Sequence, residues 1–259
     1  MNPWPSLTEA RSALAHGRGR GVKIAVLDSG IDCAHPRLSG LRLADDIAVV
    51  ELVDGRLSPA PGEGRDFFGH GTAIAGLLRE LAPEAEIGSF RVLGEQLRSR
   101  TLVIREAARL ALERGYDILN CSFGCRREEQ VLSYKDWIDE AYIRGRHIVA
   151  AANNQDFNAR EWPGHFPTVL TVSFTRCADP AALFWRPGSL VEFAARGEDV
   201  EVAWLGGGLK QVTGSSYAAP HAAALLARLL SVFPGLSPLT AKALLQQLAA
   251  PWPLVGTAP

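Results

Sequence analysis

The sequence predicts an α/β fold in three layers, αβα, with a mostly parallel central sheet. Short apolar runs typical of buried strands alternate along the chain with longer stretches of helical periodicity. Strands that alternate with helices usually pair in parallel, and their apolar character indicates helices on both faces of the sheet. The 259 residues contain no internal repeat and no low-complexity linker. One α/β domain therefore accounts for the chain.

The expected elements follow one another along the chain. Strands are predicted over residues 22–28, 86–93, 117–123, 146–153 and 168–174. Helices are predicted over residues 70–81, 101–115 and 135–145, with Thr101 as the N-cap of the second. Two further helices are predicted in the stretches SYAAPHAAALLARLL and SPLTAKALLQQLA, the latter starting at Ser237 and Pro238. We divide the chain into an N-terminal extension (1–20), the main domain (21–250) and a C-terminal tail (251–259).

Composition and charge limit the class of protein. Apolar residues make up 47% and charged residues 21%, which predicts a sizeable core and not a disordered chain. The formal charge of −1 gives no reason to expect a nucleic-acid partner. No apolar run is long enough to span a bilayer, so a membrane partner is not expected either. The N-terminus also lacks the apolar core and cleavage site of a secretory signal.

The four cysteines predict reduced thiols. They lie at positions 33, 121, 125 and 177, and no export signal indicates an oxidising compartment. Cys121 and Cys125 are four residues apart, but no second Cys or His pair stands at a zinc-binding distance in the sequence. We therefore expect no metal site from these cysteines.

Polar residues stand where the predicted strands end. Asp28 ends the first strand, Ser122 to Gly124 end another, and Asn153 and Asn154 end a third. In parallel sheets covered by helices, ligands bind outside the carboxyl ends of the strands. These positions are therefore candidates for a functional site.

Three residues have the chemistry of nucleophilic catalysis: Asp28 in VLDSGID, His70 in FFGHGTAIAG and Ser216 in GSSYAAPH. A serine nucleophile needs an imidazole to take its proton and a carboxylate to orient the imidazole. Each residue also has an ordinary structural interpretation, as a turn cap, a loop histidine and a helix N-cap. No G-x-S-x-G motif surrounds Ser216, which argues against an α/β-hydrolase.

Together the motifs DSGID, HGTAIAG and GSSYAAP resemble those of the subtilisin-like serine proteases, the subtilases, in the same Asp–His–Ser order. The resemblance spans about residues 20–248. It implies a subtilisin-like fold, a subtilase catalytic domain over 21–250 and serine endopeptidase activity. It makes Ser216 the nucleophile, His70 the general acid and base, and Asp28 the orienting carboxylate. Ser215 is then a structural neighbour.

The resemblance extends to the oxyanion donor. AAANN at 150–154 resembles the motif that supplies a side-chain amide in the family, and Asn154 falls at the donor position. This chain has Asn153 where the family usually has Gly. It also has Tyr217 after the nucleophile, where the family often has Met.

Substrate-binding residues follow from the same resemblance. Ser122, Phe123 and Gly124 form one wall of the pocket for the residue before the cleaved bond. Glu161 falls near the pocket floor and would favour Lys or Arg; alternatively, it is a surface glutamate.

The stretch LGEQLRSRT, residues 93–101, matches the family's Gly-rich substrate-binding edge strand and contains Arg98, Ser99 and Arg100. The two arginines are either solvated or read acidic residues upstream of the cut.

The resemblance also bears on cofactors, partners and location. Many relatives carry a calcium loop after the histidine helix, but here helix runs directly into strand, so we expect no tight calcium there and no other cofactor; a weak calcium site elsewhere stays open. The expected partner is a peptide or protein substrate.

Only about twenty residues precede the first strand, so either a signal and a prodomain were trimmed or the enzyme is cytoplasmic. The latter suits a processing protease with a narrow substrate, such as a precursor peptide. A catalytically silent peptide-binding module, or an esterase or transferase with the same triad, stays open.

Overall fold

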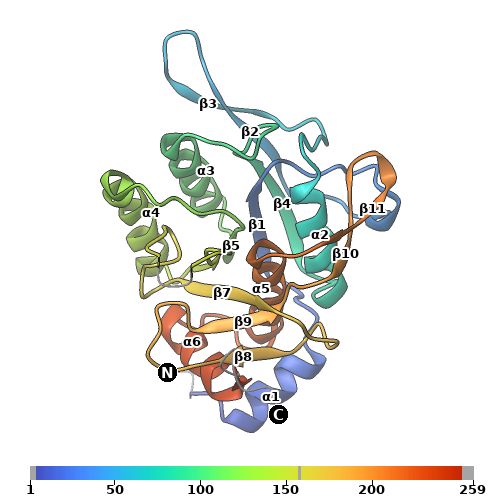
Figure 1. Cartoon of the computed structure of the whole chain (residues 1–259), viewed down its shortest axis with the longest axis vertical. Helices are drawn as coiled ribbons and strands as arrows, with labels where there is room; N and C mark the ends of the chain where they lie inside the picture. Colours follow the sequence, from blue (N-terminus) through green and yellow to red (C-terminus); the bar gives the residue numbers. More distant parts are fainter. Residues whose placement is uncertain (1–3, 157–158, 253–259) are drawn as a thin grey trace.

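The computed structural model describes residues 4–156 and 159–252. Its main feature is a ten-stranded sheet that runs through the centre of the molecule, with strand order β12-β8-β9-β7-β6-β5-β1-β4-β2-β3 (Figure 1). From β9 to β2 neighbouring strands are parallel, and only β3 and β8 pair with a neighbour in the antiparallel direction. The bounds are β1 Lys23–Asp28, β2 Asp46–Glu51, β3 Leu57–Pro61, β4 Glu86–Arg91, β5 Ile118–Cys121, β6 His147–Ala151, β7 Leu170–Thr175, β8 Leu183–Trp185, β9 Phe193–Arg196 and β12 Ala250–Pro251.

A separate antiparallel hairpin lies outside this sheet and is formed by β10 (Val200–Ala203) and β11 (Leu209–Val212). β10 contacts α2, so the hairpin stands beside the helix that begins at His70.

Helices cover both faces of the sheet, as the sequence predicts. One core contains residues of α1 (Leu7–His16), α2 (His70–Leu81), α5 (Ser215–Val232) and α6 (Pro238–Leu248). The other contains residues of α3 (Thr101–Glu113) and α4 (Val131–Ile143). In β1, Ile24 and Val26 face the first core, whereas Ala25 and Leu27 face the second. A strand that is apolar on both faces has to lie in the middle layer, so the three-layer αβα fold is confirmed.

Several local predictions are corrected. Thr101 is the first helical residue of α3, and Arg100 occupies the N-cap position without a side-chain cap bond. α4 starts at Val131, four residues before the predicted start, after a short 3₁₀ turn. Ser237, by contrast, caps α6 as predicted, since its hydroxyl accepts a hydrogen bond from the Thr240 N–H.

The helix α1 is an element that the sequence analysis did not predict. It lies within the segment assigned as an N-terminal extension and begins with a capping box between Ser6 and Glu9. Its apolar face buries Ala10 and Ala13 against α5. An apolar stripe made of small alanines gives a weak periodic signal, which explains why the helix was missed.

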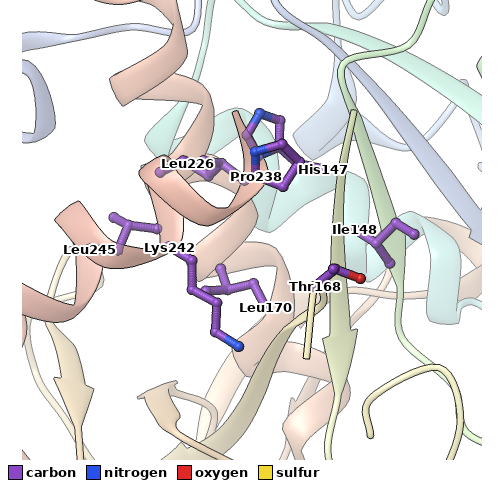
Figure 2. A pocket seen from close by; sticks show the side chains of 9 residues that line it. His147, Ile148, Thr168, Leu170, Leu226, Pro238, Lys242 and Leu245 are labelled. Carbon is purple, nitrogen blue, oxygen red and sulfur yellow. The ribbon is translucent and has the colours of Figure 1, made fainter. Parts of the chain in front are cut away.

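A small cavity at the amino end of the sheet lies far from the strand ends that the sequence singles out. Figure 2 shows its lining around the first residues of β6 and β7, with His147, Thr168 and Lys242 nearby. Its volume of about 10 Å³ is room for roughly one water molecule. In the described part of the chain, no helix has the length and apolar character needed to cross a membrane.

Candidate active site

The side chains of Asp28 and His70 meet at the carboxyl end of β1. Asp28 is the last residue of the strand and is fully buried, and His70 is the first residue of α2. Nδ1 of His70 lies 2.8 and 2.9 Å from the two carboxylate oxygens of Asp28. Because a carboxylate only accepts hydrogen bonds, Nδ1 carries the proton, and Nε2 is left free to act as a base.

Opposing influences set the pKa of His70. Burial, the largest of them, lowers this pKa, since it disfavours the charged imidazolium. The negative charge and hydrogen bond of Asp28, together with the charge of Asp66, act in the other direction. The net result is a pKa above the usual histidine value.

Close backbone packing explains the glycines around His70. A Cβ on Gly71 would lie 2.1 Å from the carbonyl oxygen of Gly30. Gly30 itself has φ +105°, and Gly69 has φ +100°, in the region that favours glycine. The three glycines therefore let α2 begin directly against the end of β1.

The hydroxyl of Ser216 lies at the start of α5. Its Oγ donates to the carbonyl oxygen of Ser122 at 3.1 Å, and Oγ of Ser122 donates back to the carbonyl of Ser216 at 2.9 Å. The next residue, Tyr217, packs its ring on His70 with centroids 5.3 Å apart. The first residues of α5 thus contact both the segment after β5 and the imidazole, while the Ser216 hydroxyl itself bonds to the Ser122 carbonyl.

Asn154 points toward the start of the same helix. Its Oδ1 lies 2.8 Å from both the backbone nitrogen and the hydroxyl of Ser215. Its Nδ2 lies 3.3 Å from the place where a Cβ on Gly214 would stand. The amide oxygen is thereby held, and the NH₂ group stays available as a donor. Ser215 is buried and serves this arrangement, in keeping with a structural role.

Two segments lie side by side near the carboxyl ends of β5 and β6. Cys125 and Trp162 exchange backbone hydrogen bonds of 2.8 and 2.9 Å. A Cβ on Gly124 would lie only 2.2 Å from Cδ of Glu161, so the Glu161 side chain packs directly on the Gly124 backbone. The segment 122–124, which is predicted to form one wall of the pocket, therefore lies next to the segment that carries Glu161, and the Glu161 side chain packs on its last residue.

The carboxyl of Glu161 is half-buried, and burial raises its pKa. Two neighbours act against this shift: the Asn153 amide, whose Nδ2 donates to Oε1 at 3.4 Å, and the charge of Arg126. Asn153 also accepts, through Oδ1, the N–H groups of the two residues after Asn154. It is therefore a turn residue next to the pocket, and Asn154 is the asparagine that faces α5.

The model of the subtilase family matches residues 19–255, most of the chain. This chain belongs to the subtilase family. Subtilisin BL from Lederbergia lenta is 29% identical over 235 residues, which cover 85% of this chain and 81% of that protein. An intracellular serine protease from Paenibacillus polymyxa is 30% identical over 229 residues, 81% of this chain and 67% of that protein. The crystal structure of a cold-adapted subtilisin-like serine proteinase has a TM-score of 0.73 at 25% identity. It covers 90% of this chain and 83% of that one. The chain is a serine endopeptidase by family.

The predicted substrate-binding arginines of this subtilase lie in a turn. The N–H of Gly94 donates to the carbonyl of Arg98, and α3 starts at Thr101, so no strand forms between β4 and α3. Arg98 is exposed, and Ser99 bonds only locally to the next carbonyl. Arg100 forms an ion pair with Glu51 on β2. Phe123, in the segment predicted to form one wall of the pocket, is partly buried against the second core.

Sequence reasoning missed Asp66, four residues before His70. Its carboxylate accepts hydrogen bonds from the N–H groups of Gly69 and Thr72 at the start of α2. An acidic residue just before a helix that begins with the candidate base was the available signal.

The described residues contain no group of three or more His, Cys, Asp or Glu side chains arranged to hold a metal ion. α2 ends at Leu81 and β4 starts at Glu86, so only residues 82–85 connect them.

Proposed function

We propose that this subtilase hydrolyses peptide bonds with Ser216 as nucleophile, His70 as general base and acid, and Asp28 as the orienting carboxylate. The observation that carries the proposal is the contact of His70 Nδ1 with both oxygens of a buried aspartate. That contact directs Nε2 away from Asp28 and stabilises the imidazolium that forms during the reaction.

The reaction begins when the Ser216 hydroxyl rotates from the Ser122 carbonyl toward Nε2 of His70. The hydroxyl proton passes to Nε2, and Oγ attacks the substrate carbonyl carbon. The C–N bond breaks as the imidazolium gives its proton to the leaving amine. Water then attacks the acyl-enzyme, with His70 again taking and returning the proton.

Asn154 Nδ2 and the Ser216 backbone N–H would stabilise the negative charge on the substrate oxygen. The Ser216 N–H lies in the first turn of α5, where N–H groups have no partner within the helix. The positive end of the helix dipole acts in the same direction. Fixed donors of this kind stabilise the transition state more than the ground state.

Glu161 supports a preference for Lys or Arg before the cleaved bond. A half-buried carboxylate packed on the Gly124 backbone would bind a cationic side chain through charge-assisted hydrogen bonds. A pocket selective for Lys or Arg would suit processing of one precursor peptide or a few. Both Arg98 and Arg100 are exposed, but Arg100 is held in an ion pair with Glu51, so Arg98 is the better candidate to bind acidic residues upstream of the cut.

We also propose that the enzyme needs no tightly bound calcium after α2 and that it works in the cytoplasm. The short connection of residues 82–85 supports the first proposal. The four free thiols at Cys33, Cys121, Cys125 and Cys177 support the second, because reduced thiols are typical of that compartment.

Labelling with a serine-directed fluorophosphonate tests the mechanism. We expect one adduct on Ser216 and none in Ser216→Ala, together with cleavage of a peptide library by the wild type alone. Absence of labelling at Ser216, or equal labelling of the variant, would refute the triad and favour a silent peptide-binding module. Labelling with hydrolysis of esters but no peptide would instead favour an esterase.

A further inference from the structure

The carboxylate of Asp66 is the centre of a hydrogen-bond network next to the triad. Its Oδ1 accepts from the Ser29 hydroxyl at 2.7 Å, the Gly69 N–H at 2.7 Å and the Phe68 N–H at 2.9 Å. Its Oδ2 accepts from the N–H and hydroxyl of Thr72 at 2.8 and 2.6 Å. The Asp66 side chain thus binds the backbone on both sides of His70 in the sequence, at Gly69 before it and at Thr72 after it.

Ser29 connects this carboxylate to that of Asp28. Ser29 Oγ lies 2.7 Å from Asp66 Oδ1 and 3.2 Å from Asp28 Oδ1. The hydroxyl has one proton, and the shorter distance assigns it to Asp66. Ser29 Oγ then accepts the N–H of Gly71 at 3.1 Å, and the Ser29 N–H donates to Asp28 at 2.8 Å. Ser29 therefore ties β1, the loop before α2 and the first turn of α2 together.

We propose that Asp66 is a positioning residue for the catalytic pair: through Ser29 and the first turn of α2, it holds His70 against Asp28, and its charge sets the pH range in which His70 can accept a proton. This inference rests on the proposed triad.

The effect of the Asp66 charge on His70 follows from the charged and titratable groups around the imidazole. Asp28 on β1 and Asp66 before α2 carry negative charge, and both raise the pKa of His70 against the effect of burial. Tyr217 on α5 and Cys121 on β5 face the same carboxylate of Asp28 and stay neutral. Burial raises the pKa of Tyr217 to about 12 and also raises that of Cys121. The charge of Asp66 is therefore the influence on His70 that can be removed while the triad stays intact.

A cap for α2 alone would not explain this network. Gly69 is the N-cap residue and has no side chain to accept a bond, so Asp66 does satisfy helix N–H groups. A cap would affect stability only. The bond to Ser29 reaches out of the helix to the strand that carries Asp28, and it predicts an effect on the pH profile as well.

Asp66→Asn tests the charge with little change in shape. Removing a negative charge lowers the pKa of His70, so the acid limb of kcat should move to lower pH. We expect kcat at the plateau to fall and KM to stay within about twofold, because the substrate pocket is not touched. Asp32→Asn is the matched control: the Asp32 carboxylate accepts a bond from the Ala34 N–H, and its charge is not among those that raise the pKa of His70. Only the Asp32 backbone N–H, which the substitution keeps, bonds to the Thr72 hydroxyl. The acid limb of kcat in this control variant should stay at the wild-type pH.

Two results would overturn the inference: an unmoved acid limb of kcat in an active Asp66→Asn enzyme, or an equal shift in Asp32→Asn.

If circular dichroism shows that Asp66→Asn does not fold, the variant Ser29→Ala decides. It keeps both charges but removes the link, so kcat should fall about tenfold or more with KM unchanged, and an unchanged kcat would overturn the proposal. A wild type without labelling at Ser216 would count against the proposed function itself. If the wild type is active but the acid limb of kcat does not move in Asp66→Asn, the result counts against the role of Asp66 alone.

Discussion

Replacing Glu161 with glutamine removes a charge from the proposed substrate pocket while nearly preserving the shape of the side chain. The side chain packs on Gly124, and its carboxylate is half-buried beside the Asn153 amide. Hydrogen bonds to charged groups are worth about 1.5–3 kcal/mol. At about 1.4 kcal/mol per factor of ten, the loss in kcat/KM for an Arg substrate is roughly ten- to 150-fold. Because the carboxylate is still partly solvated, we expect about 30-fold.

The assay compares short peptides that differ only in Arg, Phe or Leu before the cleaved bond. The Arg peptide should lose kcat/KM in Glu161→Gln, and the Phe and Leu peptides should be unchanged or slightly better. Glu128→Gln is the matched control, because Glu128 is 74% exposed and pairs loosely with Arg160 on the same surface. It should leave all three rates unchanged.

The pH dependence gives an independent check. Burial raises the pKa of Glu161, so its carboxyl is neutral at acidic pH and ionised above the raised pKa. The ratio of Arg to Phe cleavage should therefore rise with pH through that pKa in the wild type and stay flat in Glu161→Gln. A wild type that prefers Phe or Leu, or an Arg preference that persists in the variant, would refute the reasoning.

Three further predictions concern the same site. Asn154→Ala should lower kcat by about 10²–10³ with little change in KM, a magnitude known from subtilisin itself; steady-state kinetics would show an unchanged kcat if the amide plays no part. Gly124→Ala should reduce kcat/KM for Arg peptides without unfolding the protein, since its Cβ would stand 2.2 Å from Cδ of Glu161 and displace that side chain; wild-type cleavage of the Arg peptide would contradict this. Overnight dialysis against EDTA should leave activity and the thermal midpoint unchanged, and loss of either, restored by calcium, would show that a structural cation is needed.

Much of the candidate site could be proposed from the sequence because its residues lie in short contiguous motifs. Asp28, His70 and Ser216 each stand at the end of a strand or the start of a helix, and parallel strands bring such ends to one edge of the sheet. The motif around Asn154 is equally local. The buried strands β1, β5 and β6 were predictable for the same reason, since a run that is apolar on both faces is a property of the sequence itself.

Contacts between distant segments could not be predicted in this way. The reciprocal bonds of Ser122 and Ser216 join residues 94 positions apart, and Ser29 and Asp66 are 37 positions apart. Neither pair has a sequence pattern that marks it. The helix α1 was missed because two buried alanines give little periodic signal, although they pack fully against α5.

The sequence by itself determined the layer order, the family motifs and the types of reacting group, because periodicity and short motifs are local properties. Only the tertiary structure decided which asparagine faces α5, that Glu161 packs on Gly124, and that Asp66 is linked through Ser29 to Asp28. The physical reason is that hydrogen bonds and packing at the edge of a parallel sheet depend on where strands far apart in the chain end relative to one another, and that relation exists only once the chain has folded.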